Sequence, residues 1–330
     1  MTNKQVLITT VPFGEADPKP LESLAEAGIG YTLNPFHRKL REQELSELIG
    51  DCTVLIAGTE PITERVMDRA PNLRLISRVG IGLDNVDLLA ARQRGIQVCY
   101  TPDAPSAAVA ELTVGLMLSL LRSIPNADRS LRRGVWHRYM GRRLAECTVG
   151  VIGVGRVGHK LIRCLSGFRP TILANDIQPD FEAQDLKHVR WTNKDSIYAH
   201  ADIITVHVPL TGLTWNLISK QEIDLMKPTA LLINTSRGGV VNEEDLASAL
   251  ESKRISGAAL DVFEEEPYSG RLAALENCVL TCHMGSMTLD CRARMELEAA
   301  EEAIRYLTGQ PMMRCVPEEE FVNPAGRSRS

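Results

Sequence analysis

The sequence predicts an α/β protein with two doubly wound parallel sheets. Short apolar runs alternate with segments of helical apolar spacing along most of the 330 residues. This alternation is typical of βαβ units, whose strands form parallel sheets. A glycine-rich turn follows one apolar run near the middle of the chain, and the alternation then resumes. Because this length accommodates about two domains, we expect one sheet in each of two lobes.

The elements of the first sheet can be assigned in order. The strands are QVLITT (5–10), TVLIAG (53–58), LRLISRV (73–79) and IQVCY (96–100). The helical segments are LESLAEAG (21–28), EQELSELIG (42–50), TERVMDRAP (63–71) and NVDLLAARQRG (85–95). Two prolines then interrupt the chain at 100–105, which predicts a domain boundary. The apolar-rich run 107–121 predicts a helix that leads into the second lobe.

The second sheet follows the same pattern. Its predicted strands are TVGVI (148–152), TILAND (171–176), ADIITVHV (201–208), ALLINT (230–235), SGAALDV (256–262) and CVLTC (278–282). A last helix, 287–307, carries the chain back to the first lobe. The predicted domains are therefore 1–101 with 286–330, and 102–285, joined by two connections that form a hinge beside a cleft. The polar tail 318–330 is predicted to be disordered.

Composition excludes several function classes. A net charge of -5 gives no general attraction to nucleic acid or to an anionic membrane. No apolar segment has the length of a signal peptide or membrane span. The eight cysteines are scattered without metal-ligand spacing, so no metal site is expected. We expect Cys99, Cys147, Cys164 and Cys278 to be small buried hydrophobes, in a protein of the reducing cytoplasm.

The glycine-rich turn has the pattern Gly153-x-Gly155-x-x-Gly158 between a strand and a helix. In that context the pattern predicts dinucleotide binding, because backbone and helix N-terminus can approach a pyrophosphate. Asp176 ends the next strand, where a carboxylate can bond a ribose 2′-hydroxyl and repel a 2′-phosphate. We therefore predict NAD as the cofactor. The alternative is a tight βα turn without a ligand.

Three further loops follow strands of the same sheet and carry an arginine, a carboxylate and a histidine. They contain Arg237, Glu264–Glu266 and His283. Strand ends of a parallel sheet share one edge, so these groups are expected near the glycine turn. Arginine can bind a substrate carboxylate, histidine can exchange a proton, and a carboxylate can orient the histidine. Each residue also has a plain alternative as a surface or loop residue.

Seven ordered motifs make the chain resemble the D-isomer-specific 2-hydroxyacid dehydrogenase family, particularly its phosphoglycerate-dehydrogenase-like branch. They are SRVGIGLDNVD (77–87), AVAELTVGLMLSLLR (108–122), GVIGVGRVG (150–158), ITVHVPLTGLT (204–214), INTSRGGVVNEEDLASAL (233–250), GAALDVFEEEP (257–267) and LTCHMGSMT (280–288). The resemblance implies a flavodoxin-like substrate-binding lobe, 1–101 with 286–330, and an inserted Rossmann NAD-binding lobe, 102–285.

The resemblance also implies specific roles. It makes Arg237, Glu266 and His283 catalytic, and it selects Glu266 from the acidic run. The implied substrate-binding residues are Arg78, Val79, Gly80 and Arg237. The implied cofactor-binding residues are Gly153, Gly155, Arg156, Val157, Gly158, Asp176, Val208, Pro209, Thr214, Thr235, Ser236, Asp261 and Gly285. It further implies a homodimer formed through the NAD-binding domain, with 107–121 and 134–144 at the interface.

Departures from the family pattern affect the substrate. Cys282 replaces the usual proline before the histidine, which leaves the loop less stiff. Glu60 and Ala57 occupy a loop that is basic in phosphoglycerate-oxidising relatives, which weakens the case for a phosphorylated substrate. Positive charge for such a substrate remains available from other residues: Arg78, Arg138, Arg142 and Arg143. His207 is interpreted as structural.

The sequence favours an NAD-dependent oxidoreductase that interconverts a small D-2-hydroxy acid and its 2-keto acid, and a phosphoglycerate-dehydrogenase-like activity is one form of this function that stays open. Two alternatives remain open: a non-enzymatic NAD(H)-sensing, corepressor-like protein of the same fold, and a Rossmann-type methyltransferase. The latter gives no reason for the Arg–Glu–His set.

Overall fold

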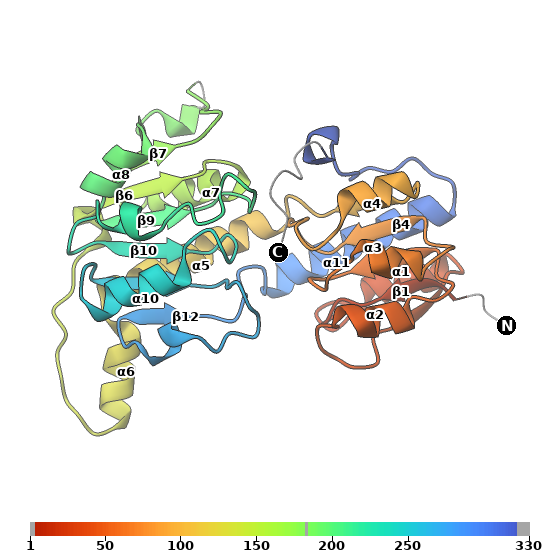
Figure 1. Cartoon of the computed structure of the whole chain (residues 1–330), viewed down its shortest axis with the longest axis horizontal. Helices are drawn as coiled ribbons and strands as arrows, with labels where there is room; N and C mark the ends of the chain where they lie inside the picture. The colour runs from red at the N-terminus through yellow and green to blue at the C-terminus, as the bar shows by residue number, and fades with distance from the viewer. Residues whose placement is uncertain (1–3, 182–183, 322–330) are drawn as a thin grey trace. The chain divides into compact units, whose positions relative to one another are not determined.

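The computed structural model describes residues 4–181 and 184–321 (Figure 1). The chain divides into two compact units, with boundaries between Pro105 and Ser106 and between Gly285 and Ser286. Unit 1 contains the segments before the first boundary and after the second, and unit 2 lies between them. Each sheet consists of parallel strands, so the predicted α/β class with two doubly wound parallel sheets is confirmed.

Unit 1 has a five-stranded sheet in the order β2-β1-β3-β4-β5. This 2-1-3-4-5 order is the flavodoxin-like order that was predicted. The strands are β1 (Lys4–Ile8), β2 (Gly30–Leu33), β3 (Val54–Ala57), β4 (Leu75–Arg78) and β5 (Gln97–Tyr100). The helices are α1 (Lys19–Glu26), α2 (Glu42–Leu48), α3 (Glu64–Asp68), α4 (Leu88–Gln93) and α11 (Leu289–Leu307).

Three helices of unit 1 begin at side chains that accept the first free backbone N–H groups. Thr63 caps α3, Asp87 caps α4 by accepting from Ala90 N at 2.9 Å, and Thr288 caps α11. Such caps stabilise a helix by about 1 kcal/mol. They explain why these three helices begin where they do.

The C-terminal segment of unit 1 differs from its prediction. Glu318–Phe321 form a short 3-10 helix, η4, and Phe321 packs against the buried core of the unit. The Arg92 guanidinium pairs with Glu318 and lies 3.9 Å from the centre of the Phe321 ring. The prediction of disorder is wrong for 318–321 because an aromatic side chain anchors them, whereas 322–330 lie outside the described residues.

Unit 2 has a seven-stranded sheet in the order β12-β11-β10-β9-β6-β7-β8. The strands are β6 (Thr148–Ile152), β7 (Thr171–Asn175), β8 (Arg190–Trp191), β9 (Ile203–Val206), β10 (Leu231–Asn234), β11 (Gly257–Leu260) and β12 (Cys278–Leu280). The α-helices are α5 (Pro105–Leu121), α6 (Ile124–Arg132), α7 (Arg156–Leu165), α8 (Lys194–His200), α9 (Lys220–Ile223) and α10 (Glu243–Glu251). The 3-10 turns are η1 (Leu144–Glu146), η2 (Gln184–Leu186) and η3 (Arg271–Ala274).

Two cores cover the two faces of this sheet. On β9, Ile203 packs into the core formed with α5 and α7, whereas Ile204 packs into the core formed with α8 and α10. Successive strand residues point to opposite faces, so both faces are buried, as expected of a parallel sheet. Each strand therefore ends in a loop at an edge between two helical layers.

The four cysteines that were predicted to be buried differ in their exposure. Cys99, Cys147 and Cys278 are buried as predicted, but Cys164 is exposed on α7. Its apolar neighbours Leu161 and Leu165 face the core, and helical spacing turns Cys164 away from them.

Among the residues that the structure describes, no single helix has the length and apolar character needed to cross a membrane. Helices α5 and α6 reach that length and apolar character only when taken together, and they are bent by 60° at the break between them.

Candidate active site

The glycine-rich turn joins β6 to α7 at the point where the strand order of unit 2 reverses. Chain order runs from β6 outward to β7 and β8, and then returns to β9 on the other side of β6. Ligands of doubly wound sheets bind at such a switch point, beyond the carboxyl ends of the strands. The turn therefore has the position that dinucleotide binding requires.

The three glycines of the turn meet different constraints. Gly153 has φ +92°, and a Cβ there would lie 2.7 Å from the His207 carbonyl oxygen. A Cβ on Gly158 would lie 2.1 Å from the Gly153 carbonyl oxygen, which accounts for close helix–strand packing. A Cβ on Gly155 would meet nothing within 4 Å. The turn thus leaves open space at Gly155, directly before the N-terminus of α7.

Asp176 is tied to this turn. One carboxylate oxygen accepts from Val154 N at 2.6 Å, and the other accepts from Gln178 N at 2.8 Å. Ile177, the next residue, is 97% exposed. The Asp176 carboxylate is therefore fixed beside the glycine turn, and the next residue, Ile177, carries no positive charge. Open backbone, helix N-terminus and carboxylate together fit the diphosphate and ribose of NAD.

The turn after β10 is organised by Asn234, which is buried and was not singled out from the sequence. Its Oδ1 accepts from Ser236 N at 3.0 Å and from Ser236 Oγ at 2.8 Å. Its Nδ2 donates to the Arg237 carbonyl oxygen at 2.8 Å. Arg237 itself is half-buried, and its Nη1 donates to the Ser236 carbonyl oxygen at 2.7 Å. In the sequence, these hydrogen bonds are indicated only by the presence of an asparagine at the end of a strand.

Asp261 follows β11 and holds the loop that carries His283. It is 1% exposed, and its Oδ1 accepts from Thr281 Oγ1 at 2.6 Å and from Met284 N at 2.9 Å. Its Oδ2 accepts from Gly285 N at 2.8 Å, and its backbone carbonyl accepts from His283 N at 2.7 Å. Four donors from one loop therefore converge on one residue. Sequence reasoning assigned Asp261 to the cofactor and missed this bracing.

His283 and Glu266 form a close pair. His283 Nδ1 lies 2.9 Å from both carboxylate oxygens of Glu266, and the two side chains are 33% and 24% exposed. Glu266 also accepts from Phe263 N at 3.2 Å. The predicted choice of Glu266 within the acidic run thus coincides with the carboxylate that contacts the imidazole. Since Nδ1 donates to the carboxylate, Nε2 is the ring nitrogen left to exchange a proton.

The remaining residues predicted for the cofactor lie on loops of the same unit. Thr214 Oγ1 donates to the Pro209 carbonyl oxygen at 2.6 Å and accepts from Thr211 N at 2.8 Å, so it braces the segment after β9. Thr235 is buried, with Oγ1 2.9 Å from Thr113 Oγ1. Four others lie in the segment after β9, in the first turn of α7 and in the loop after β12: Val208, Arg156, Val157 and Gly285. Their contacts with a cofactor stay a prediction.

His207 is a second histidine near the glycine turn. Burial lowers its pKa to about 4. Its Nε2 lies 2.9 Å from Thr205 Oγ1, and its buried Nδ1 has no hydrogen-bond partner among the described residues. A ring held neutral in this way is a poor proton donor near neutral pH, which agrees with its interpretation as structural.

The predicted substrate residues of unit 1 use their polar groups locally. Val79 N donates to the Ala57 carbonyl oxygen at 2.8 Å, and Gly80 N donates to Thr101 Oγ1 at 2.8 Å. Arg78 Nε donates to Asn85 Oδ1 at 3.3 Å, and its Nη1 donates to the Val79 carbonyl oxygen. A substrate that bound the N–H groups of Val79 and Gly80 would have to share them with the Ala57 carbonyl oxygen and Thr101 Oγ1, or displace these acceptors. Their role in substrate binding stays a prediction.

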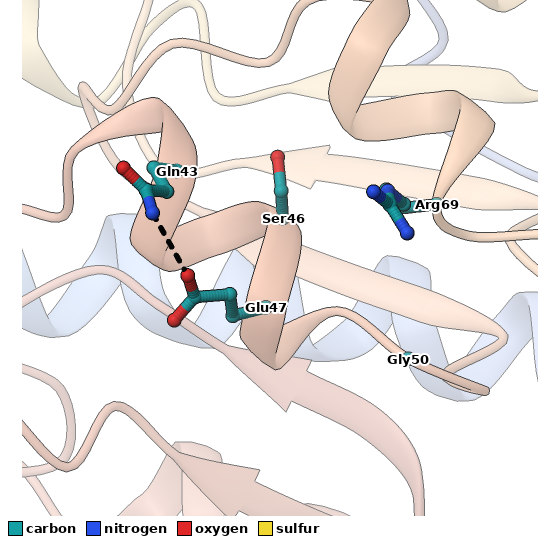
Figure 2. A pocket seen from close by; sticks show the side chains of 5 residues that line it. All are labelled: Gln43, Ser46, Glu47, Gly50 and Arg69. Carbon is teal, nitrogen blue, oxygen red and sulfur yellow. Dashed lines mark hydrogen bonds between the residues drawn. The ribbon is translucent and has the colours of Figure 1, made fainter.

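A surface hollow of unit 1 contains none of the predicted site residues (Figure 2). It is lined by Gln43, Ser46, Glu47, Gly50 and Arg69, where α2 faces the end of α3. Gln43 Nε2 donates to Glu47 Oε1 at 3.1 Å along its wall. Its lining offers no acid–base pair comparable with His283 and Glu266, so the candidate active site is placed in unit 2.

Comparisons with known proteins agree with the fold and identify the family. A family model described as "D-isomer specific 2-hydroxyacid dehydrogenase, NAD binding domain" matches residues 114–285. The chain belongs to the D-isomer specific 2-hydroxyacid dehydrogenase family, and its unit 2 contains that family's NAD-binding domain.

Relatives with curated names include a D-3-phosphoglycerate dehydrogenase of Methanocaldococcus jannaschii, 38% identical over 310 residues. That match covers 92% of this chain but only 58% of the relative. A glyoxylate reductase of Thermofilum pendens is 39% identical over 279 residues, which is 82% of each chain. This chain thus spans little more than half of the first relative and most of the second.

Solved structures are also similar. The TT0316 protein from Thermus thermophilus has a TM-score of 0.86 at 32% identity, covering 94% of this chain and 99% of the other. The D-lactate dehydrogenase from Aquifex aeolicus, complexed with NAD and lactic acid, has a TM-score of 0.82 at 26% identity, covering 92% and 96%.

Proposed function

We propose that the protein is an NAD-dependent dehydrogenase that interconverts a small D-2-hydroxy acid and its 2-keto acid. The observation that carries this proposal is the His283–Glu266 pair, with Nδ1 2.9 Å from both carboxylate oxygens, on the unit that carries the glycine turn. Family membership supports the reaction class. A nucleotide-holding scaffold alone needs no such acid–base pair.

Each side chain has a role in this reaction. When bound, NAD(H) supplies the hydride chemistry. In the reducing direction, His283 Nε2 gives a proton to the carbonyl oxygen as it becomes a hydroxyl; in the oxidising direction it takes that proton back. Glu266 holds Nδ1 and stabilises the imidazolium. Arg237 binds the substrate carboxylate through its planar guanidinium.

Small unphosphorylated acids are the proposed substrates. Glu60 is 1% exposed, and its carboxylate accepts from Gly58 N at 3.1 Å and from the Thr9 hydroxyl. This buried acidic group lies in the loop after β3, which is basic in the phosphoglycerate-oxidising relatives to which the sequence was likened. An acidic residue in place of a basic one removes a cation that could bind a second anionic group on the substrate.

Steady-state assays test this proposal. Purified protein is mixed with NADH and, in turn, glyoxylate, hydroxypyruvate, pyruvate and 3-phosphohydroxypyruvate. We expect NADH oxidation with one of the unphosphorylated acids and the weakest kcat/KM with the phosphorylated one. Tight NADH binding with no turnover across the panel, together with NADH-dependent association, would instead support the NAD(H)-sensing alternative.

Homodimerisation through unit 2 is part of the proposal. Helix α6 and the segment after it run out from the sheet of unit 2 before the chain returns to β6 (Figure 1). They expose large apolar side chains: Leu131, Val135, Trp136 and Met140 are 58%, 53%, 83% and 98% exposed. Exposed apolar patches mark interaction surfaces. Trp136→Asp should convert a dimer to a monomer in light scattering, whereas Phe36→Asp in unit 1 should not.

The cytoplasm is the proposed location. Support comes from the thiols: all eight cysteines lie in the described residues and are free. Structural disulfides are usual in oxidising compartments and rare in the cytosol. Fractionation of cells that express the untagged protein would test the proposal.

A further inference from the structure

Two cysteines far apart in the chain lie opposite each other in unit 1. Cys99 is in β5 and Cys315 is in the C-terminal segment, and they form an isolated antiparallel bridge. Their Sγ atoms are 3.6 Å apart. Cys99 is fully buried, whereas Cys315 is exposed. The pair therefore combines an accessible thiol with a protected one.

Backbone geometry favours a covalent link between them. Tyr100 N donates to the Arg314 carbonyl oxygen at 3.1 Å, and Val316 N donates to the Val98 carbonyl oxygen at 2.9 Å. These bonds flank the two cysteines, so Cys99 and Cys315 are a non-hydrogen-bonded antiparallel pair. Residues of such pairs have Cα atoms about 4.5 Å apart, within the range of about 4.4–6.8 Å found in disulfides. Rotation of the exposed Cys315 side chain can bring the sulfurs together.

A buried carboxylate adjoins the pair. Glu302 of α11 is 1% exposed, and its Oε2 lies 3.7 Å from Cys99 Sγ, which donates to it. The same carboxylate accepts from Met313 N at 3.1 Å and from Arg314 Nη1 at 3.1 Å. It therefore aligns the C-terminal segment with β5 and is placed to receive the Cys99 proton. Among the described residues no three metal-ligating side chains group together, so a thiol reaction fits better than a metal site.

We propose that Cys99 and Cys315 form a reversible disulfide, with Cys315 as the thiol that meets the oxidant and Cys99 as the resolving thiol. With hydrogen peroxide as oxidant, Cys315 becomes a sulfenic acid and one water is released. Cys99 sulfur then attacks Cys315 sulfur and displaces hydroxide, while Glu302 takes the Cys99 proton and passes it to that hydroxide. Overall, two thiols and one peroxide give one disulfide and two waters.

The order of the two steps follows from exposure. Burial raises the pKa of the Cys99 thiol, and the nearby Cys315 and Glu302 raise it further. Since the thiolate is the reactive form, Cys99 stays protonated until Glu302 accepts its proton. Peroxide in solvent therefore meets Cys315 first.

The test treats the full-length protein with one equivalent of hydrogen peroxide, followed by alkylation under denaturing conditions and peptide mapping. Two of the eight thiols should be protected from alkylation. Peptides containing Cys99 and Cys315 should be linked, and dithiothreitol should restore both thiols. Cys315→Ser should abolish the protection, while Cys164→Ser, which removes another exposed thiol, should leave the link intact.

Glu302→Gln tests whether the Glu302 carboxylate takes the Cys99 proton or only lies near the two cysteines. The sulfenic acid at Cys315, trapped by dimedone, should form at the wild-type rate, and closure of the disulfide should slow about 10-fold or more. The proposal is overturned if Cys99 stays alkylatable after peroxide treatment, if Cys315 proceeds to sulfinic acid, or if Cys315 links two chains instead. Because the readout is thiol chemistry, its failure is independent of the proposed dehydrogenase activity.

Discussion

The two units use the same parallel-sheet construction but treat their strand-end loops differently. In unit 2, Asn234 and Asp261 accept the backbone donors of the turns that present Arg237 and His283. In unit 1, the loops after β4 and β5 bond each other, as Gly80 N donates to Thr101 Oγ1. Buried acceptors at strand ends also occur in unit 1, where Glu60 accepts from Gly58 N. The His283–Glu266 pair, and not the parallel sheet or its buried acceptors, therefore distinguishes the edge of unit 2.

The largest effect should come from His283→Gln. Glutamine can still contact Glu266 but cannot exchange a proton near neutral pH, so kcat should fall about 10³-fold. NADH affinity, measured by fluorescence titration, should stay within about 2-fold of wild type, since a loss of proton transfer leaves the nucleotide contacts in place. His200→Gln on α8 is the matched control and should be silent. Unchanged turnover in His283→Gln would remove this histidine from its role.

Glu266→Gln should have a smaller effect. It replaces the carboxylate that holds His283 Nδ1 at 2.9 Å. We expect kcat to fall roughly 10- to 100-fold, the range known for loss of a carboxylate partner of a metal-bound histidine. Glu265→Gln, in the same acidic run but exposed, should change kcat by less than about 2-fold. Equal losses in both variants would mean that the acidic run acts by charge alone.

Asp261→Asn tests the bracing of unit 2. Its amide cannot accept from all of Thr281, Met284 and Gly285, so a buried donor loses its acceptor. Such a loss costs about 1–3 kcal/mol, or roughly 2–10 °C in Tm for a unit of this size. We expect kcat to fall with it, while Thr101→Val in unit 1 should lower Tm without a comparable loss of kcat. The reverse result would place the functional edge in unit 1.

The smallest effects concern pH, and they should have opposite signs in the two units. In unit 1, burial raises the pKa of Glu296 more than Gly14 N and Arg292 lower it. The contribution of Glu296 to the free energy of unfolding is full below pH 4.5, the pKa of this group in the unfolded chain. It is lost as the pH rises through the raised pKa of the folded state. In unit 2, burial would raise the pKa of Asp202, but donation from Thr148 N, Lys227 and Arg142 lowers it overall.

The contribution of Asp202 is therefore full above the unfolded value of 3.8 and is lost as pH falls through the lowered folded pKa. Relative to wild type, Glu296→Gln should gain Tm as pH rises from about 4 to 7, and Asp202→Asn should lose Tm as pH rises from about 2 to 4. Each change should be about 2 °C by differential scanning fluorimetry. If rising pH changed the Tm of both variants in the same direction relative to wild type, the predicted difference between the two units would be contradicted.

Sequence reasoning located the main strands and the site loops because buried strands are continuous apolar runs and their ends carry the polar residues. It missed β2 and β8, which are short edge strands; GYTL and Arg190–Trp191 offer too few apolar residues to predict a strand. It also missed α6, which has no buried residue. Local apolar spacing cannot reveal elements that bury little.

The hydrogen bonds that brace the candidate site were not predicted from the sequence. Asp261 reaches donors 20 to 24 residues away, and Asn234 bonds within its own turn. Neither contact has a spacing that distinguishes it from other strand-end polar residues. Cys99 and Cys315 are separated by 216 positions, so only the folded chain brings their sulfurs together.

One carboxylate also links the reactive loop to the end of unit 2. Gly285 is the last residue before the chain passes to Ser286 of unit 1, and its N–H is bonded to Asp261. Asp261 accepts His283 N through its own carbonyl. A substitution that removes the Asp261 carboxylate would therefore loosen the last residue of unit 2 and the loop of His283 together.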